Sequence, residues 1–240
     1  MISTIRLYFP DKIQSDLSPH LDKEQTHYVK DVMRLKTGDK LSIFNTFGEW
    51  KAVIESYQKD GAKIKIIGKA RDKDDEKNIW LAFSPIKQNP LNFLIQKGTE
   101  LGVQQFIPIL SERTVVRKIN TKRIKKIIIE ASEQSNRISV PEIKKPKSLK
   151  NFLSEFPKNG YLIFCNINSN KKNLKNILSE KIDGPICILI GPEGDFSENE
   201  RKIIIDFNKT YSISLAKNIL KSETAALSAI TIVNYHLNLS

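Results

Sequence analysis

The chain contains 240 residues, enough for one large domain or two modest ones. Hydrophobic residues make up 40% and charged residues 28%, which is typical of a globular protein and excludes disordered, collagen-like and coiled-coil chains. The 39 basic residues outnumber the 27 acidic ones and give a net charge of +12. This excess favours a polyanionic partner, with nucleic acid first, although a solvated lysine-rich surface produces the same balance.

The cysteines and the N-terminal residues indicate the cellular compartment. Cys165 and Cys187 each lie next to an apolar run, so we interpret both as small buried core residues in a reducing compartment, without disulfide or metal-ligand spacing. The first ten residues lack the basic start and apolar stretch of a secretory signal, and no apolar run approaches the roughly 18 residues that span a bilayer. We therefore expect a cytoplasmic protein that does not enter a membrane.

The N-terminal part of the chain has the pattern of a small β-structure. Apolar residues between Thr26 and Leu35 have the spacing of one short amphipathic helix. Three later segments show partial or clear alternation of apolar and polar residues, at 41–44, 50–54 and 62–66. They predict a β-meander or barrel. Residues 69–78, of which eight of ten are charged, then predict a linker or an exposed crossing.

The remainder of the chain alternates between strand and helix patterns. Five buried strands are predicted, at 79–83, 106–110, 161–165, 186–190 and 211–215. Helical spacing follows a possible N-cap at Asn120 or Thr121, and again follows a capping box from Ser197 to Glu200. This alternation predicts a parallel α/β sheet with helices on both faces.

One loop is a candidate ligand site because ligands of open α/β sheets collect beyond the carboxyl ends of strands. The strand predicted at 186–190 passes directly into Gly191-Pro-Glu-Gly194-Asp-Phe, where a ligand can approach bare backbone. Neither GxGxxG nor GxxxxGK[ST] occurs in the chain, which disfavours a dinucleotide or NTP cradle. A nucleoside cofactor without phosphates, such as S-adenosylmethionine, fits better. A plain strand-to-helix turn is the alternative.

Two further clusters could carry chemistry. The last strand exit leads into a helix rich in small residues that Ser222 or Thr224 can cap, which also describes an ordinary packed helix. A polar cluster of Glu130, Glu133, Gln134 and Arg137 could face a base edge or phosphate, or could be a solvated helix end. The chain's three histidines, His20, His27 and His236, are scattered, so we reject metal catalysis and a Ser-His-Asp triad.

Five blocks in order along nearly the whole chain resemble the bacterial ribosomal RNA small subunit methyltransferase E family, within the SPOUT class of knotted methyltransferases. The blocks are: His27 to Asp39 with Phe44-Asn-Thr-Phe-Gly-Glu-Trp50; Gln96-Lys-Gly-Thr-Glu-Leu-Gly-Val103 with Ile107-Pro108 and Ser111-Glu-Arg113; Ala131-Ser-Glu-Gln134 with Arg137 and Val140-Pro-Glu142; Leu189-Ile-Gly-Pro-Glu-Gly194; and Ile219-Leu-Lys-Ser-Glu-Thr-Ala-Ala226.

This resemblance implies an N-terminal PUA-like RNA-binding β-barrel over residues 1–70 and a C-terminal SPOUT methyltransferase domain over residues 71–240 whose chain end forms a trefoil knot. Sequence periodicity alone predicts an ordinary doubly wound sheet, because chains generally avoid knots. The implied activity is methylation of uridine N3 in 16S rRNA with S-adenosylmethionine. The implied partners are 16S rRNA or the small ribosomal subunit, in a cytoplasmic homodimer that needs no metal.

The resemblance also assigns residues. For catalysis it implies Arg137, Glu223 and Arg113. For the cofactor it implies the loops after three strands, with Cys165, Asn166, Ile190, Gly191, Pro192, Glu193, Gly194, Leu215, Ala216, Ile219, Leu220 and Thr224. For RNA binding we expect Arg6, Lys30, Arg34, Lys97 and Gln134.

The chain departs from the family pattern at three places. The final strand exit has Leu215-Ala-Lys-Asn218 where Leu-Gly-Pro-Arg is common, and Lys221 and Lys30 stand where arginine is common. Lysine keeps the charge but loses bidentate geometry. Two other functions compete with the methyltransferase: a non-catalytic RNA-binding or ribosome-assembly protein that retained the fold, and a nucleotide-dependent oxidoreductase. The intact Gly191 and Gly194 oppose the first, and the missing phosphate fingerprint opposes the second.

Overall fold

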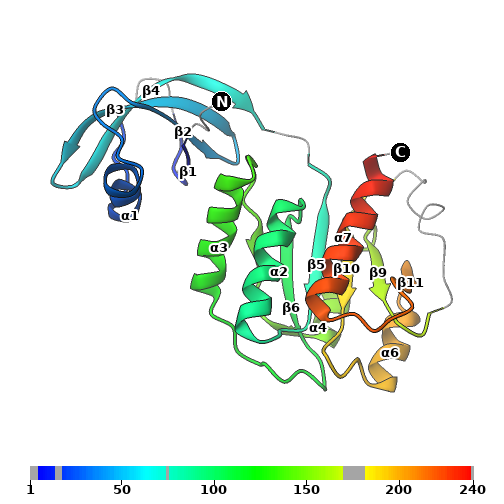
Figure 1. Cartoon of the computed structure of the whole chain (residues 1–240). Helices are drawn as coiled ribbons and strands as arrows, with labels where there is room; N and C mark the ends of the chain where they lie inside the picture. The colour runs from blue at the N-terminus through cyan, green and yellow to red at the C-terminus, as the bar shows by residue number, and fades with distance from the viewer. Residues whose placement is uncertain (1–4, 14–17, 74–75, 170–181, 239–240) are drawn as a thin grey trace. The chain divides into compact units, whose positions relative to one another are not determined.

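The protein forms two compact units, each described here by itself (Figure 1). The computed structural model describes residues 5–13, 18–73, 76–169 and 182–238. The first unit contains Met1–Asp75 and Ser132–Val140, and the second contains Glu76–Ala131 and Pro141–Ser240. Among the described residues, no helix has both the length and the apolar character needed to span a membrane.

The first unit contains a small mixed sheet. Its strands are β1 (Arg6–Tyr8), β2 (Lys40–Asn45), β3 (Gly48–Gln58) and β4 (Gly61–Asp72), paired in the order β1-β2-β3-β4. The strands β2 to β4 are antiparallel neighbours and confirm the predicted meander, while β1 pairs parallel to β2. Beyond β4 the pairing continues through an isolated antiparallel bridge between His20 and Lys63, so the described residues show a mixed sheet and the barrel stays a prediction.

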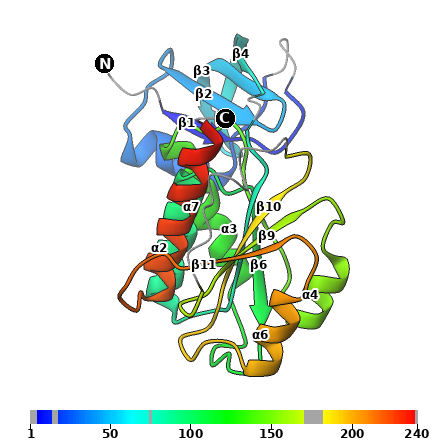
Figure 2. The same cartoon turned by 90° about the vertical axis from the view of Figure 1, so that its right-hand side faces the viewer.

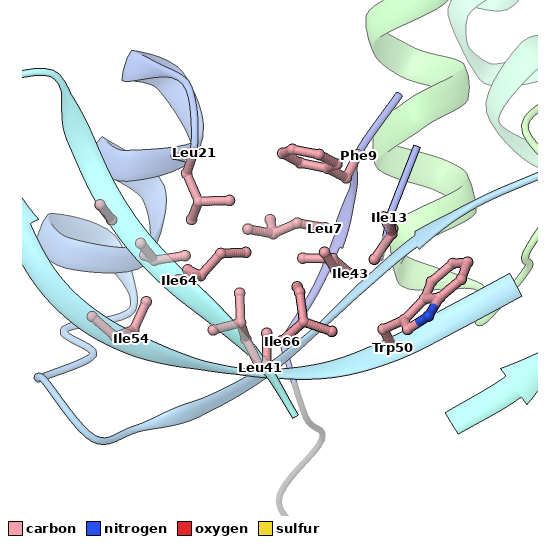
Figure 3. Packing of buried hydrophobic residues seen from close by; sticks show 13 residues of the cluster. Leu7, Phe9, Ile13, Leu21, Leu41, Ile43, Trp50, Ile54, Ile64 and Ile66 are labelled. Carbon is pink, nitrogen blue, oxygen red and sulfur yellow. The ribbon is translucent and has the colours of Figure 1, made fainter. Parts of the chain in front are cut away.

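The core of this unit follows from alternation along the strands, because successive side chains of a strand point to opposite faces. Leu41 and Ile43 of β2 and Ile64 and Ile66 of β4 are at most 2% exposed, and Figure 3 shows them gathered on one side of the sheet. Leu21 covers them from the segment before α1 (Lys23–His27). The expected short helix is present as α1 followed by a π-helical turn, η1 (Tyr28–Val32).

The charged segment predicted as a linker is partly strand. The strand β4 continues to Asp72, and Arg71 pairs in register with Glu49 of β3. The prediction failed because a high density of charged residues was taken to exclude a strand, whereas an edge strand tolerates charge well. Residues 74 and 75 of the predicted linker lie outside the described residues.

The second unit is built on a parallel sheet, as predicted. Its strands pair in the order β11-β9-β10-β5-β6-β7, with β8 beside β6. They are β5 (Ile79–Phe83), β6 (Gln105–Leu110), β7 (Glu142–Ile143), β8 (Lys147–Ser148), β9 (Tyr161–Cys165), β10 (Ile186–Ile190) and β11 (Thr210–Ile213). The five predicted strands are therefore confirmed as β5, β6, β9, β10 and β11. The continuous apolar runs of β5, β6, β9 and β10 reflect burial on both faces, whereas β11 lies at the end of the sheet and is mostly half-buried.

Helices cover both faces of this sheet (Figure 2). The helices α2 (Gln88–Glu100) and α7 (Ser222–Asn238) lie side by side on one face, and α4 (Leu149–Glu155) and α6 (Glu198–Ile205) lie on the other. Cys187 and Leu189 of β10 pack with α4 and α6, which leaves the alternate residue Ile188 for the opposite face. The predicted capping box of Ser197 and Glu200 opens α6.

The helix α3 (Thr121–Gln134) contains the boundary between the two units. Its residues 121–131 belong to the second unit, whereas its last turn from Ser132 belongs to the first. Of the two predicted N-caps, Asn120 is the one observed, because its side-chain oxygen accepts a hydrogen bond from Arg123 N at 3.1 Å. Ile124 and Ile128 are buried at 2% and 1% exposure and anchor the helix.

Candidate functional site

The carboxyl ends of three neighbouring strands meet at one edge of the parallel sheet. Ser84, just after β5, donates its backbone N–H to the carbonyl oxygen of Ile190, at the end of β10, over 3.1 Å. Arg113, after β6, donates from Nη1 to the carbonyl oxygen of Gly194 over 2.9 Å. The predicted loop after β10 is thus in contact with the loop after β6, which places Arg113 beside Gly194.

The loop from Gly191 to Phe196 is held in one shape by Asp195. This residue has a positive φ of 57°, a strained conformation for a side chain other than glycine. Its carboxylate accepts hydrogen bonds from Phe196 N at 2.7 Å and from Arg201 Nη2 at 2.5 Å. The sequence analysis did not predict the Asp195–Arg201 pair. The signal for it was an acidic residue in the loop followed by an arginine in the next predicted helix.

The two glycines of this loop differ in whether the surrounding protein atoms leave room for a side chain. A Cβ on Gly191 would lie 3.0 Å from the Phe196 ring, so packing within the protein favours glycine there. A Cβ on Gly194 would find its nearest atoms, in the Arg113 side chain, at 3.9 Å, an ordinary contact distance. Packing within the described residues therefore does not require glycine at position 194. The missing side chain leaves backbone open to a ligand.

The other two predicted cofactor loops also approach one another. Asn166, after β9, is 6% exposed and donates its backbone N–H to Ile213 O of β11 at 2.8 Å. Ser169 donates from Oγ to Ser212 O at 2.9 Å, which joins the same two strand ends. Ser222 at the start of α7 donates from Oγ to Gly191 O at 3.5 Å. Loops after β9, β10 and β11 are thus linked in pairs around one edge of the sheet.

The individual cofactor candidates differ in exposure. Ile190 and Pro192 are buried, whereas Glu193 and Gly194 are exposed. In the last loop Leu215, Ala216 and Leu220 are half-buried, while Ile219 is 85% exposed and Thr224 is exposed on α7. Cys165 ends β9 with a free thiol, whose pKa is raised to about 12 by desolvation. This thiol is therefore uncharged at neutral pH and contributes packing, not charge.

The three catalytic candidates lie in different units. Glu223 is half-buried in the first turn of α7, next to Ser222, and Arg113 is exposed beside Gly194; both belong to the second unit. Arg137 belongs to the first unit, is 7% exposed, and donates from Nη2 to Ser139 Oγ at 2.7 Å. Arg113 and Glu223 therefore lie at the same group of loops in the second unit. Arg137 lies in the first unit.

Arg6 and Glu49 form a buried ion pair in the first unit, with side chains 9% and 7% exposed and 3.1 Å apart. Arg6 also donates from Nη2 to Arg137 O at 2.8 Å, and from Nη1 to Glu133 O and Ser132 O at 3.0 and 3.2 Å. Arg6 thus donates to carbonyl groups at and just after the end of α3. Sequence reasoning missed this arrangement because the acceptors lie more than 100 residues from Arg6.

Arg71 completes this arrangement, which we call the Glu49 network: Arg6, Glu49 and Arg71. Arg71 Nη2 lies 2.8 Å from Glu49 Oε2 and donates to Asn136 O at 2.9 Å. Burial opposes ionisation of Glu49, but its hydrogen bonds and charge interactions with Arg6 and Arg71 outweigh burial and lower its pKa. The network thus holds a carboxylate between two guanidinium groups at the end of α3.

The structure corrects the expectation that Arg6 meets RNA phosphates. Its guanidinium is nearly inaccessible and already donates to Glu49 and to three carbonyl groups. A basic residue near the N-terminus was assumed to be exposed, but Arg6 lies in β1, inside the unit. We therefore remove Arg6 from the predicted RNA-binding residues and assign it to the Glu49 network.

The other predicted RNA-binding residues lie in both units. Lys30 and Arg34 are exposed in the first unit, with Lys30 Nζ 5.4 Å from the centre of the Tyr57 ring. Gln134 is exposed at the end of α3. Lys97 lies in α2 and forms an ion pair with Glu100 at 2.8 Å, which reduces the charge that it can offer to a phosphate.

Comparison with known proteins matches both parts of the chain. A family model described as an RNA methyltransferase domain matches residues 73–234, and one described as an RNA methyltransferase PUA domain matches residues 21–67. A ribosomal RNA small subunit methyltransferase E from Rickettsia conorii is 33% identical over 228 residues, covering 94% of this chain and 93% of the relative. The protein of the same name from Bacillus subtilis is 29% identical, with coverages of 90% and 89%.

Two solved structures are similar over nearly the whole length. A ribosomal RNA small subunit methyltransferase E from Neisseria gonorrhoeae, bound to S-adenosyl methionine, has a TM-score of 0.88 at 28% identity and 97% coverage of both chains. A putative methyltransferase from Legionella pneumophila, in complex with the same cofactor, has a TM-score of 0.83 at 28% identity and 98% coverage of both chains. Both relatives thus carry S-adenosylmethionine on this fold.

Proposed function

Since this chain belongs to the ribosomal RNA small subunit methyltransferase E family, we propose that it methylates N3 of a uridine in 16S rRNA, with S-adenosylmethionine as the methyl donor. The observation that carries the proposal is the exposed Gly194 in the loop after β10, where neighbouring protein atoms leave room for a Cβ. Two relatives with the same fold bind this cofactor.

The cofactor fits the residues at this edge of the sheet. Gly194 offers open backbone, and the linked loops after β9 and β11 supply the buried amide of Asn166 and the small, half-buried side chain of Ala216. A nucleoside without phosphates needs neither a glycine-rich phosphate motif nor a basic cradle, and the chain contains neither phosphate motif. The departures at Ala216 and Lys217 keep small or flexible side chains in the last loop.

The reaction must remove a proton from uridine N3, which titrates well above neutrality. The cofactor supplies an electrophilic methyl group, so the transfer forms the nitrogen–carbon bond, breaks the sulfur–carbon bond and releases the N3 proton. We assign that proton to the Glu223 carboxylate, and we assign Arg113 to stabilising the negative charge that develops on the base. Arg137, which can donate to two oxygens at once, stays a predicted catalytic residue of the first unit.

The proposal also covers the domain organisation, the chain topology and the oligomeric state. We assign residues 1–70 to a PUA-like domain that holds RNA and residues 71–240 to the methyltransferase domain, with a trefoil-knotted chain end and a homodimeric assembly. The contact of Ser222 with Gly191 supports the knot, because it returns the chain from the sheet edge at β11 to the exit of β10. Light scattering of the purified chain tests the dimer, and a monomer at micromolar concentration would contradict it.

Two measurements test the function. Calorimetric titration of S-adenosylmethionine, NAD and ATP should detect binding of the first only. Mass spectrometry of 16S rRNA and of small subunits, after incubation with the protein and cofactor, should then find one methyl group on N3 of a uridine. Cofactor binding without any methyl transfer to either substrate would favour the non-catalytic RNA-binding alternative, and binding of NAD alone would favour the oxidoreductase.

Gly194→Val should abolish S-adenosylmethionine binding and leave the fold intact, because the added side chain fills the open backbone approach. Gly68→Val is the matched control, since a Cβ there meets no atom within 4 Å and the residue lies in β4 of the other unit. Calorimetry gives the affinity and circular dichroism the fold. Parental affinity in a folded Gly194→Val protein would refute the site. Gly191→Val is less informative, because its Cβ meets the Phe196 ring.

Lys30→Gln combined with Arg34→Gln should weaken RNA binding and reduce its salt dependence by roughly 0.7 to 0.9 units of slope per lost phosphate contact. Both side chains are exposed in the first unit, unlike Arg6. Affinity for 16S rRNA fragments measured over a range of KCl concentrations checks this. An unchanged slope would show that this unit does not hold RNA through these two residues.

A further inference from the structure

A basic segment connects the loop after β6 with the body of α3. Between Glu112 and Glu130 the sequence contains seven basic residues and no acidic residue. We call these residues the basic strip: Arg113, Arg117, Lys118, Lys122, Arg123, Lys125 and Lys126. All seven are exposed and all belong to the second unit, while Ile124 and Ile128 hold the opposite side of the helix in the core. The strip is thus a continuous run of charge on one unit.

Most of this charge is not neutralised by the protein. Within the described ranges, Arg117, Lys118, Lys122 and Lys125 have no carboxylate partner. Three lysines elsewhere in the same unit are paired: Lys97 with Glu100, Lys144 with Glu142 and Lys147 with Glu155.

The position of three of these cations is unfavourable for the helix itself. Lys122, Arg123 and Lys125 lie at the beginning of α3, where the helix dipole presents its positive end and disfavours further positive charge. The first turns of α6 and α7 carry acidic residues instead, Glu198 and Glu200 in α6 and Glu223 in α7. A local arrangement that lowers stability without a visible structural gain is expected at functional surfaces.

The strip also begins at the proposed cofactor site. Its first member, Arg113, bonds to Gly194 O, and Arg117 donates to Glu112 O at 3.4 Å in the same loop. Val115 lies between them with 85% of its surface exposed, an apolar side chain suited to the face of a sugar or base. The basic residues therefore extend from Arg113, which contacts the loop after β10, to the first turns of α3.

We propose that the basic strip binds the phosphate backbone of the substrate RNA and guides it to the loops after β6 and β10. This inference rests on the proposed function for the identity of the RNA, and it adds a contact surface on the methyltransferase unit itself. Phosphate contacts of this kind position RNA without reading its sequence.

The test is a charge-removal variant with Lys118→Gln, Lys122→Gln and Lys125→Gln. The control removes the same charge from the same unit with Lys144→Gln, Lys145→Gln and Lys147→Gln. Affinity for a 16S rRNA fragment is measured from low to high KCl. The strip variant should lose about two units of salt slope, near 0.7 per contact to a single strand, while the control should lose much less. A strip variant with arginine at all three positions should keep the parental slope.

Two further readouts separate this surface from other effects. The cofactor affinity of the strip variant should be unchanged, and its melting temperature should stay equal or rise, because the helix start loses unfavourable charge. An unchanged slope, or an equal loss in the control, would overturn the proposal. If the protein bound RNA through the strip but methylated none, the proposed function would fail and the surface would stand.

Discussion

Replacing Glu223 by glutamine will lower the single-turnover rate of methyl transfer about 100-fold at saturating RNA and cofactor. The carboxylate is proposed to take the N3 proton, and loss of a proton-transfer or electrostatic partner acts on this scale. Glutamine has nearly the same shape, so packing at the start of α7 is retained. The rate is measured by rapid mixing with labelled cofactor, and both binding constants are expected to stay near the parental values.

The matched control is Glu198→Gln, which removes a carboxylate from the first turn of α6, another helix of the same unit. It should methylate at the parental rate. Raising the pH should partly restore the Glu223→Gln rate, since more of the uridine is then already deprotonated. A parental rate at neutral pH in Glu223→Gln would end its catalytic assignment. Arg137→Ala needs a stability measurement beside the rate, because Arg137 is only 7% exposed.

Replacing Glu49 by alanine will destabilise the first unit by about 3 kcal/mol or more, because removal of one partner from a buried ion pair leaves the other charge uncompensated. Arg6 would remain 9% exposed with carbonyl acceptors but no counter-charge. Urea unfolding followed by Trp50 fluorescence reports on this unit, in a background where the chain's other tryptophan, Trp80, is replaced by phenylalanine.

The control is Glu55→Ala, which removes the half-exposed partner of Lys63 in the same unit and should change the unfolding free energy little. The pH dependence gives a second check. The pKa of Glu49 is lowered from 4.5 by folding, so its stabilisation is present above about pH 4.5 and is lost as the pH falls through the lower value. Glu49→Gln should lack this acid-dependent loss. Equal acid sensitivity in both proteins would remove Glu49 as its source.

The sequence was sufficient to predict those elements whose burial produces a regular pattern of apolar residues. Continuous apolar runs identified β5, β6, β9 and β10 because strands inside a parallel sheet are covered on both faces. The loop after β10 could be found because its glycines follow such a run directly. Both the strand and the loop depend on neighbours close in sequence, which is why single-chain patterns could predict them.

Long-range pairing could not be predicted in the same way. Arg6 looked like an exposed cation because nothing near it in sequence shows that its acceptors lie at Ser132, Glu133 and Arg137. Arg71 likewise appeared to belong to a charged linker, whereas it pairs with Glu49 across the sheet. The division of α3 between two units leaves no mark on its amphipathic spacing, since the helix is continuous across the boundary.

The first unit consists of two chain segments, so it cannot be completed until the second of them has been synthesised. The first unit is discontinuous, and the carbonyl groups that receive Arg6 are synthesised 126 to 131 residues after it. At bacterial-like elongation rates of roughly 5 to 20 residues per second, the N-terminal sheet waits about 3 to 13 seconds for residues 76–140. During that interval Glu49 can already pair with its two arginines, but Arg6 and Arg71 lack acceptors from the later segment. Final closure of the first unit is thus timed by translation of the second.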